Sequence, residues 1–197
     1  MDLRIAFFGD SVVNGFGDPD GLGWVGRVCA AAIARGHTVT SYNAGIRRNT
    51  SADVRERWRD EALRRLPVEH SCALVFSFGV NDCLVDGGRR MLEPAATISN
   101  TRQILAGAKT LAPTLMVGPP PISDADVNAR VAALIPELQA VCRVLSMPFL
   151  DVFGALQSSA VWMSEASAND GAHPGRGGYQ ALAALVDRWP PWRAWLP

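Results

Sequence analysis

The sequence predicts an α/β protein, a three-layer α/β/α sandwich built on a five-stranded parallel sheet. Short apolar segments alternate with longer helix-like segments along the chain, in the order β-α-β-α-β-α-β-α-β-α. The segment Ala73–Phe78 is a nearly continuous apolar run, which is typical of a strand buried on both faces. Alternation of this kind implies parallel strands joined by right-handed crossovers, with helices on both faces of one sheet.

The first half of the chain contains three of the expected strands. Ser51 and Asp53 occupy positions where N-terminal capping and the helix dipole favour them, and Pro67 stops the same helix. A loop rich in Gly, Asp and Pro follows the first strand. The expected elements are a strand over Leu3–Gly9, a helix over Val25–Ala34, a strand over Thr38–Asn43, a helix over Ser51–Leu66 and a strand over Ala73–Phe78.

The second half continues the alternation with two more strands. Three prolines at 119–121 end the fourth strand, and Pro136 is a possible kink or break in the helix that follows. Asp124 and Asp126 open that helix, where carboxylates are usually favoured by the dipole rather than by a metal. The expected elements are a helix over Ala95–Leu111, a strand over Thr114–Gly118, a helix over Asp124–Ser146, a strand over Pro148–Val152 and a helix over Gly177–Trp189. We expect the Trp-rich tail, residues 189–197, to pack back onto the domain, although a dimer contact is an alternative.

Length and composition favour a single domain, residues 1–197, that does not bind nucleic acid. The chain has 197 residues with 19 Lys+Arg and 19 Asp+Glu, and the absence of a basic run argues against nucleic acid. No segment is long and apolar enough to span a membrane, and no signal peptide precedes the first strand, so we expect a cytoplasmic protein without stable membrane insertion. The oligomeric state stays open.

Two motifs that could indicate a cofactor or metal are better explained by structure. The four cysteines lack CxxC spacing, so reduced, mostly buried thiols without metal are expected, although Cys83 could line a site near Asn81. Residues 21–26 match the dinucleotide pattern GxGxxG. They do not follow a strand directly, and no acidic residue occurs between Asp20 and Asp53 to bind a ribose. We therefore expect no cofactor.

Ser11 lies two residues after the first strand, at the carboxyl edge of the sheet, where open α/β sheets bind ligands. A hydroxyl needs an adjacent base to act as a nucleophile. His37 and His70 precede strands and must lie at the opposite edge, so His173 is the one histidine that can reach Ser11. Asp170, three residues earlier, can orient the imidazole, and Pro174 disfavours helix at His173.

Donors for an oxyanion follow the first three strands. The backbone N–H of Ser11, the N–H of Gly45 and the side-chain amide of Asn81 are the candidates. Candidates for the pocket rim are Arg47, Asn49, Pro119–Pro121 with Pro120 at the centre, Ile122 and Trp162.

Four segments together resemble the SGNH/GDSL hydrolase family of esterases and lipases. They are Gly9-Asp10-Ser11, Gly45, Gly79-Val80-Asn81-Asp82 and Asp170-Gly-Ala-His173, and they appear in the family's order over the whole chain. The resemblance implies Ser11 as nucleophile, His173 as base, Asp170 as its orienting residue, and Ser11, Gly45 and Asn81 as the oxyanion hole. It also implies a flavodoxin-like strand order, 2-1-3-4-5.

The sequence thus predicts a serine esterase that works through an acyl-enzyme on a small-molecule substrate, a small or single-chain ester. Short acyl esters, lysophospholipids and acetylated sugars all remain open, as does transfer to an alcohol other than water. One alternative is a flavodoxin-type module that binds FMN in the loop holding Ser11 and Asn14. Another is an inactive relative that binds carbohydrate or protein.

Overall fold

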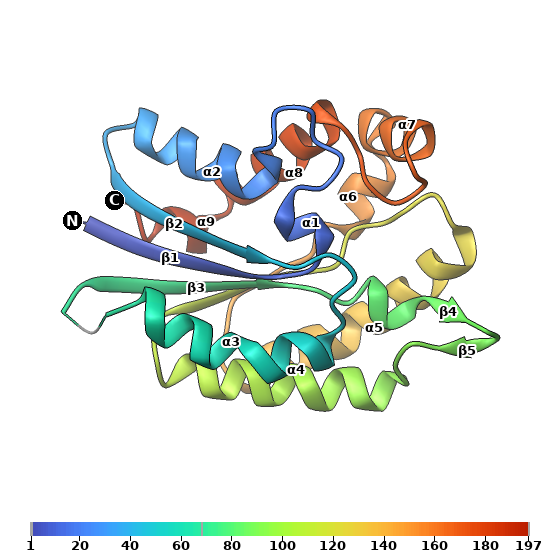
Figure 1. The fold of residues 1–197 in the computed structure, drawn as a ribbon, viewed down its shortest axis with the longest axis horizontal. Coiled ribbons are helices and arrows are strands. Elements are labelled where there is room, and N and C mark those ends of the chain that lie inside the picture. The colour runs from blue at the N-terminus through green and yellow to red at the C-terminus, as the bar shows by residue number, and fades with distance from the viewer. Residues whose placement is uncertain (1, 68, 197) are drawn as a thin grey trace.

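A computed structural model describes residues 2–67 and 69–196 of the chain (Figure 1). Five parallel strands form one sheet in the order β2-β1-β3-β6-β7, which is the expected order 2-1-3-4-5 when the five strands are counted along the chain. The predicted α/β class and topology are therefore confirmed. The strands are β1 (Asp2–Gly9), β2 (Thr38–Gly45), β3 (Ser71–Ser77), β6 (Thr114–Val117) and β7 (Phe149–Leu150), and a separate two-stranded hairpin comprises β4 (Val85–Asp86) and β5 (Arg89–Arg90).

Helices cover both faces of this sheet, which makes the three layers visible in Figure 1. A single turn of 3₁₀-helix, η1 (Asn81–Cys83), follows β3. The α-helices of the described residues are α1 (Ser11–Asn14), α2 (Gly23–Ala34), α3 (Ser51–Arg65), α4 (Pro94–Lys109), α5 (Ala125–Val144), α6 (Phe153–Gln157), α7 (Ala160–Ala168), α8 (Arg176–Arg188) and α9 (Pro190–Arg193). None of them is long and apolar enough to cross a membrane.

The side chains of β1 alternate between two hydrophobic cores. Ala6 and Phe8 pack in the core beneath α3, α4 and α5, while Ile5 and Phe7 pack in the core beneath α2, α8 and α9. All four side chains are fully buried, as the continuous apolar sequence of this strand predicts. β1 is therefore held from both faces, which gives a rigid support to the residues at its carboxyl end.

Local signals explain where the long helices begin. Thr50 and Asp53 form a capping box at the start of α3, with the backbone N–H of Thr50 donating to Asp53 Oδ2 at 2.7 Å. Asp124 caps α5 by accepting the N–H of Val127 at 2.9 Å. Pro136 does not break α5, which continues to Val144. The glycine pattern at 21–26 is the loop and start of α2, as expected.

The differences from the predicted elements lie mostly in short segments. The sequence pattern gave no sign of α1, α6, α7 or the β4–β5 hairpin, because each is too short to display a clear hydrophobic period. The second strand extends two residues beyond Asn43, and the last strand is shorter than expected. The tail does pack back, since Trp192 of α9 is fully buried against Phe7 at a ring-centroid distance of 6.2 Å.

Candidate active site

Ser11 follows a sharp change from strand to helix at the carboxyl end of the sheet. β1 ends at Gly9, where a Cβ atom would overlap the carbonyl oxygen of Ser77 on β3, so the close approach of these strands requires glycine. Asp10 caps α1 by accepting the N–H of Val12 at 2.9 Å. Ser11 is consequently the first residue of α1, and no described residue accepts its N–H.

His173 and Asp170 approach Ser11 from the loop between α7 and α8. His173 Nε2 lies 2.7 Å from Ser11 Oγ, and Nδ1 lies 2.7 Å from Asp170 Oδ2. His37 and His70 lie just before β2 and β3, at the far end of the sheet, as predicted. The structure thus brings the three residues together in the order in which a hydroxyl, a base and an orienting carboxylate must meet.

Asp170 is itself fixed by its own turn. Its Oδ1 atom accepts the backbone N–H of Ala172 at 3.0 Å and of His173 at 2.9 Å. Although partial burial acts to raise the pKa of Asp170, the N–H donors of His173 and Ala172 hold that pKa below its usual value. α8 begins only at Arg176, so His173 lies outside the helix, as Pro174 predicted. The carboxylate is therefore ionised and aimed at the imidazole.

Sequence reasoning missed the residues that pack around the imidazole. The ring of Phe16 meets His173 edge to face at a centroid distance of 4.9 Å, and its carbonyl accepts the hydroxyl of Tyr179 at 2.7 Å. Asn169 donates its side-chain amide to the carbonyl of His173 at 3.1 Å. The available signals were an aromatic residue in the loop after the nucleophile and an amide beside Asp170, and neither is specific.

The oxyanion candidates are placed differently from one another. Asn81, on η1, donates one amide hydrogen to the carbonyl of Asn49 at 2.9 Å, and no residue in the described ranges accepts the second. Gly45 instead donates its N–H to Asn43 Oδ1 at 3.0 Å, and a Cβ here would overlap the backbone of Asn14. Gly45 therefore serves the packing of β2 against α1, and its N–H is already used.

A tight turn follows Gly45 and presents another backbone donor. Asn49 donates its N–H to the carbonyl of Ile46 at 3.2 Å, which closes a four-residue turn. Arg48, its third residue, has a left-handed φ of 68°, a conformation that usually requires glycine or asparagine. No described residue accepts the N–H of Arg48. Arg57 Nε donates to Asn49 Oδ1 at 2.8 Å and so fixes the end of this turn.

The expected rim residues do not all reach the surface. Trp162 is fully buried on α7 and donates its indole N–H to the carbonyl of Pro121 at 2.9 Å, so its assignment to the rim is wrong. Pro120 is also buried, and Ile122 is only 6% exposed. Arg47 is exposed, with its guanidinium carbon 3.4 Å from the centre of the Phe16 ring.

Sequence comparison identifies the family to which these residues belong. A sequence model of the GDSL-like Lipase/Acylhydrolase family matches residues 7–181, which include Ser11, Asn81, Asp170 and His173. The chain belongs to this GDSL-like family. A Bacillus subtilis (strain 168) protein, "Uncharacterized protein YpmR", is 33% identical over 84 residues, which are 42% of this chain and 32% of that relative. The GDSL-like chain therefore matches only about a third of the length of this curated relative.

Solved structures agree with the GDSL-like fold over nearly the whole chain. The lipase/acylhydrolase from Enterococcus faecalis has a TM-score of 0.78 and 25% identity, over 98% of this chain and 97% of that one. The acetylxylan esterase Axe2 from Geobacillus stearothermophilus has a TM-score of 0.77 and 18% identity, over 94% and 92% of the two chains. The second likeness concerns the fold alone. Family membership supports ester hydrolysis as the general reaction.

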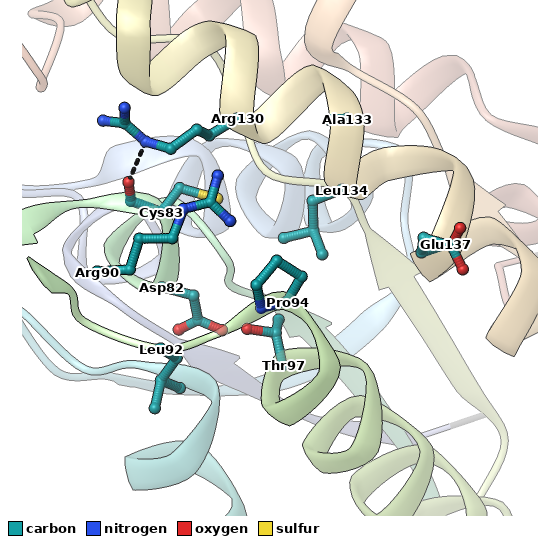
Figure 2. A pocket seen from close by; sticks show the side chains of 10 residues that line it. All are labelled: Asp82, Cys83, Arg90, Leu92, Pro94, Thr97, Arg130, Ala133, Leu134 and Glu137. Atoms are coloured by element: carbon teal, nitrogen blue, oxygen red, sulfur yellow. Dashed lines mark hydrogen bonds between the residues drawn. The ribbon is translucent and has the colours of Figure 1, made fainter.

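A cavity of about 240 Å³ lies on the other side of η1, between the hairpin, α4 and α5 (Figure 2). Cys83 lines this cavity, and none of Ser11, Asp170 and His173 does. Burial and the nearby charge of Asp82 raise the pKa of the Cys83 thiol to about 11, so it stays protonated at neutral pH. Cys83 thus lines a cavity that is separate from Ser11, Asp170 and His173.

Two buried carboxyl groups support the turns that carry the candidate residues. Asp82 Oδ1 accepts the N–H of Ser51 at 2.7 Å and so joins η1 to the start of α3. Burial raises the pKa of Asp10 to about 7. The hydrogen bond from the N–H of Val12 lowers this pKa, and the charge of Asp82 raises it further. Within residues 2–67 and 69–196, no three His, Cys, Asp or Glu side chains gather as they would around a metal.

Proposed function

We propose that this GDSL-like protein is a serine esterase that works through an acyl-enzyme and needs no cofactor. The observation that carries the proposal is the continuous chain of two 2.7 Å contacts from Ser11 Oγ through His173 to Asp170. Such a chain lets the imidazole remove the hydroxyl proton while the carboxylate stabilises the imidazolium that forms. A small or single-chain ester remains the proposed substrate.

The first half of the reaction acylates Ser11. Ser11 Oγ attacks the ester carbonyl carbon, its proton passes to His173 Nε2, and the carbonyl oxygen becomes an oxyanion. His173 then gives this proton to the alkoxide oxygen as the carbon–oxygen bond breaks, so the alcohol leaves and an acyl-serine ester remains. In the second half, water attacks the acyl carbon with His173 again as base, and the carboxylic acid leaves as Ser11 regains its proton.

For the oxyanion, we propose the N–H of Ser11, the second amide hydrogen of Asn81 and the N–H of Arg48. Each of these donors keeps a hydrogen without an acceptor among the described residues. The Arg48 N–H replaces the expected donor Gly45, because Gly45 already donates to Asn43. Preorganised donors of this kind are worth about 10²- to 10³-fold each in kcat.

Steady-state hydrolysis of phenyl acetate tests the proposal. We expect Ser11→Ala and His173→Ala each to lower kcat by about 10³-fold or more, because either change removes the nucleophile or its base. Ser99→Ala, which alters an exposed hydroxyl on α4, is the matched control and keeps full activity. Circular dichroism establishes that all variants are folded. Full activity in Ser11→Ala would overturn the mechanism, whereas a folded wild type without esterase activity would favour the binding alternatives.

A further inference from the structure

Two arginines in the turn after β2 carry charge that no acidic group among the described residues neutralises. Arg47 and Arg48 are both exposed, and neither forms an ion pair with a described residue. Arg57, on the neighbouring helix α3, pairs with Glu61 at 3.0 Å instead. The turn after β2 therefore contributes net positive charge, although the whole chain has a formal net charge of zero, and Arg47 places part of that charge on Phe16, which packs against His173.

The guanidinium of Arg47 stacks on the ring of Phe16. Its guanidinium carbon is 3.4 Å from the ring centre, and the same ring meets the imidazole of His173 at 4.9 Å. Tyr179 anchors the backbone of Phe16 through the 2.7 Å hydrogen bond to its carbonyl. Stacking uses the face of a guanidinium and leaves the N–H groups at its edge free to bind a planar anion.

The position of Phe16 indicates that the positive charge of Arg47 lies near the alcohol part of the ester. His173 Nε2 must protonate the departing alkoxide, so the alcohol part of the substrate passes the imidazole as it leaves. Phe16 packs on that imidazole and Arg47 covers Phe16. Asp170 does not compete for the guanidinium, because its ion pair is with His173 and no ion pair joins it to Arg47 among the described residues.

We propose that Arg47 binds an anionic oxygen group, a carboxylate or a phosphate, on the alcohol part of the ester. This rests on the proposed esterase activity and narrows its substrates to esters of acidic alcohols. The bond to the anion strengthens binding before the reaction and holds the leaving oxygen near His173. Arg48 adds to the positive potential that attracts such substrates, an effect that added salt screens.

Three acetate esters with related alcohols test the proposal. Phenyl acetate is neutral, 4-acetoxybenzoate has a carboxylate on the alcohol part, and 4-acetoxyphenyl phosphate has a phosphate there. The quantity measured is kcat/KM for each anionic ester divided by kcat/KM for phenyl acetate. We expect Arg47→Gln to lower this ratio about tenfold, as for the loss of one charge-assisted hydrogen bond. Arg47→Lys, which keeps the charge but loses the planar fork, lowers it less.

Arg102→Gln is the matched control, because Arg102 is exposed on α4 and its loss changes the net charge equally. Its ratio equals that of the wild type. A ratio that is unchanged in Arg47→Gln, or that Arg102→Gln lowers equally, would overturn the anion site. If Arg47→Gln lowers the ratio for only one of the two anionic esters, that ester has the anion that Arg47 prefers. If the wild type hydrolyses none of the three esters, the esterase proposal itself fails, and the anion site fails with it.

Discussion

Asn43 joins the end of β2 to the nucleophile helix through Gly45 and Val13. Its Oδ1 atom accepts the N–H of Gly45 at 3.0 Å, and its amide donates to the carbonyl of Val13 at 2.7 Å. Because Val13 belongs to α1, the position of Ser11 depends on this side chain. Asn43 thus supports the site without touching the reacting atoms.

Removing this side chain should loosen α1. We expect Asn43→Ala to lower the free energy of unfolding by about 1–3 kcal/mol, since two partly exposed hydrogen bonds are lost. We also expect kcat to fall more than KM rises, because Ser11 is less well positioned. Urea denaturation and phenyl acetate kinetics measure the two effects, and Asn43→Asp, which keeps only the acceptor, should lie between. A stable, fully active Asn43→Ala variant would show that α1 keeps its position without the two hydrogen bonds of the Asn43 side chain.

Asp170 should matter for the rate more than for binding. We expect Asp170→Asn to lower kcat by at least about 10²-fold with little change in KM, because an amide does not stabilise the imidazolium. Asp126→Asn, an exposed carboxylate in the first turn of α5, is the control. Steady-state kinetics with phenyl acetate give both constants. Equal activity of the two variants would mean that His173 acts without Asp170.

Asp10 should make stability depend on pH. Its pKa is raised to about 7 in the fold from 3.8, so the folded state holds a proton that the unfolded state loses. The contribution of Asp10 is therefore most favourable below about pH 4 and is lost as the pH rises through 7. We expect Asp10→Asn to gain stability relative to the wild type over this interval, by at most about 4 kcal/mol.

Urea denaturation at several pH values between 4 and 8 measures this difference. Asp20→Asn is the control, because the hydrogen bond and charge of Arg27 lower the pKa of Asp20 and its variant should show no such gain. A difference between wild type and Asp10→Asn that stays constant with pH would contradict a raised pKa at Asp10.

Trp162 should affect stability and leave substrate selectivity alone. The indole is fully buried and bonds Pro121, so Trp162→Ala should cost about 3–5 kcal/mol and Trp162→Phe about 1–2 kcal/mol. We expect the order of kcat/KM over acetate, butyrate and hexanoate phenyl esters to be the same in Trp162→Phe and wild type. A changed order of kcat/KM in Trp162→Phe would mean that the indole contacts the substrate.

Replacing Arg48 with glycine should stabilise the fold, since a φ of 68° strains any residue with a Cβ. We expect Arg48→Gly to raise the free energy of unfolding by up to about 1 kcal/mol, after the entropy that glycine adds to the unfolded chain. Arg47→Gly in the same turn gains no such relief and should be destabilising. Thermal unfolding of the two variants measures this difference. A lower stability of Arg48→Gly than of Arg47→Gly would contradict a strained turn.

The sequence was sufficient for the sheet and for the candidate triad because both depend on topology. The alternation of apolar strands and helices leads to one parallel sheet, and that sheet leaves His173 as the one histidine at the same edge as Ser11. The helix starts near Ser51, Asp53 and Asp124 were readable for a different reason, since local hydrogen bonding decides where a helix begins, although the side chain that caps α3 is Thr50.

The remaining errors concern features that no pattern displays. Gly45 looked like an oxyanion donor because its N–H follows a strand, but the side chain of Asn43 accepts that N–H. The left-handed turn at Arg48 was hidden, because arginine rarely adopts this conformation. Trp162 lies on α7, in a segment for which the sequence predicts no helix, and it is buried there rather than at the rim. Side-chain partners and short helices depend on tertiary contacts. The single domain and the cytoplasmic location stay predictions.

Labelling with a fluorophosphonate probe tests the central claim, an activated Ser11, without any assumption about the substrate. The protein is incubated with the probe, and the modified peptide is located by mass spectrometry, with His173→Ala treated identically. We predict one adduct on Ser11 in the wild type and a labelling rate at least about 10²-fold lower in His173→Ala. No adduct on the folded wild type, or equal labelling in His173→Ala, would contradict a serine activated by His173.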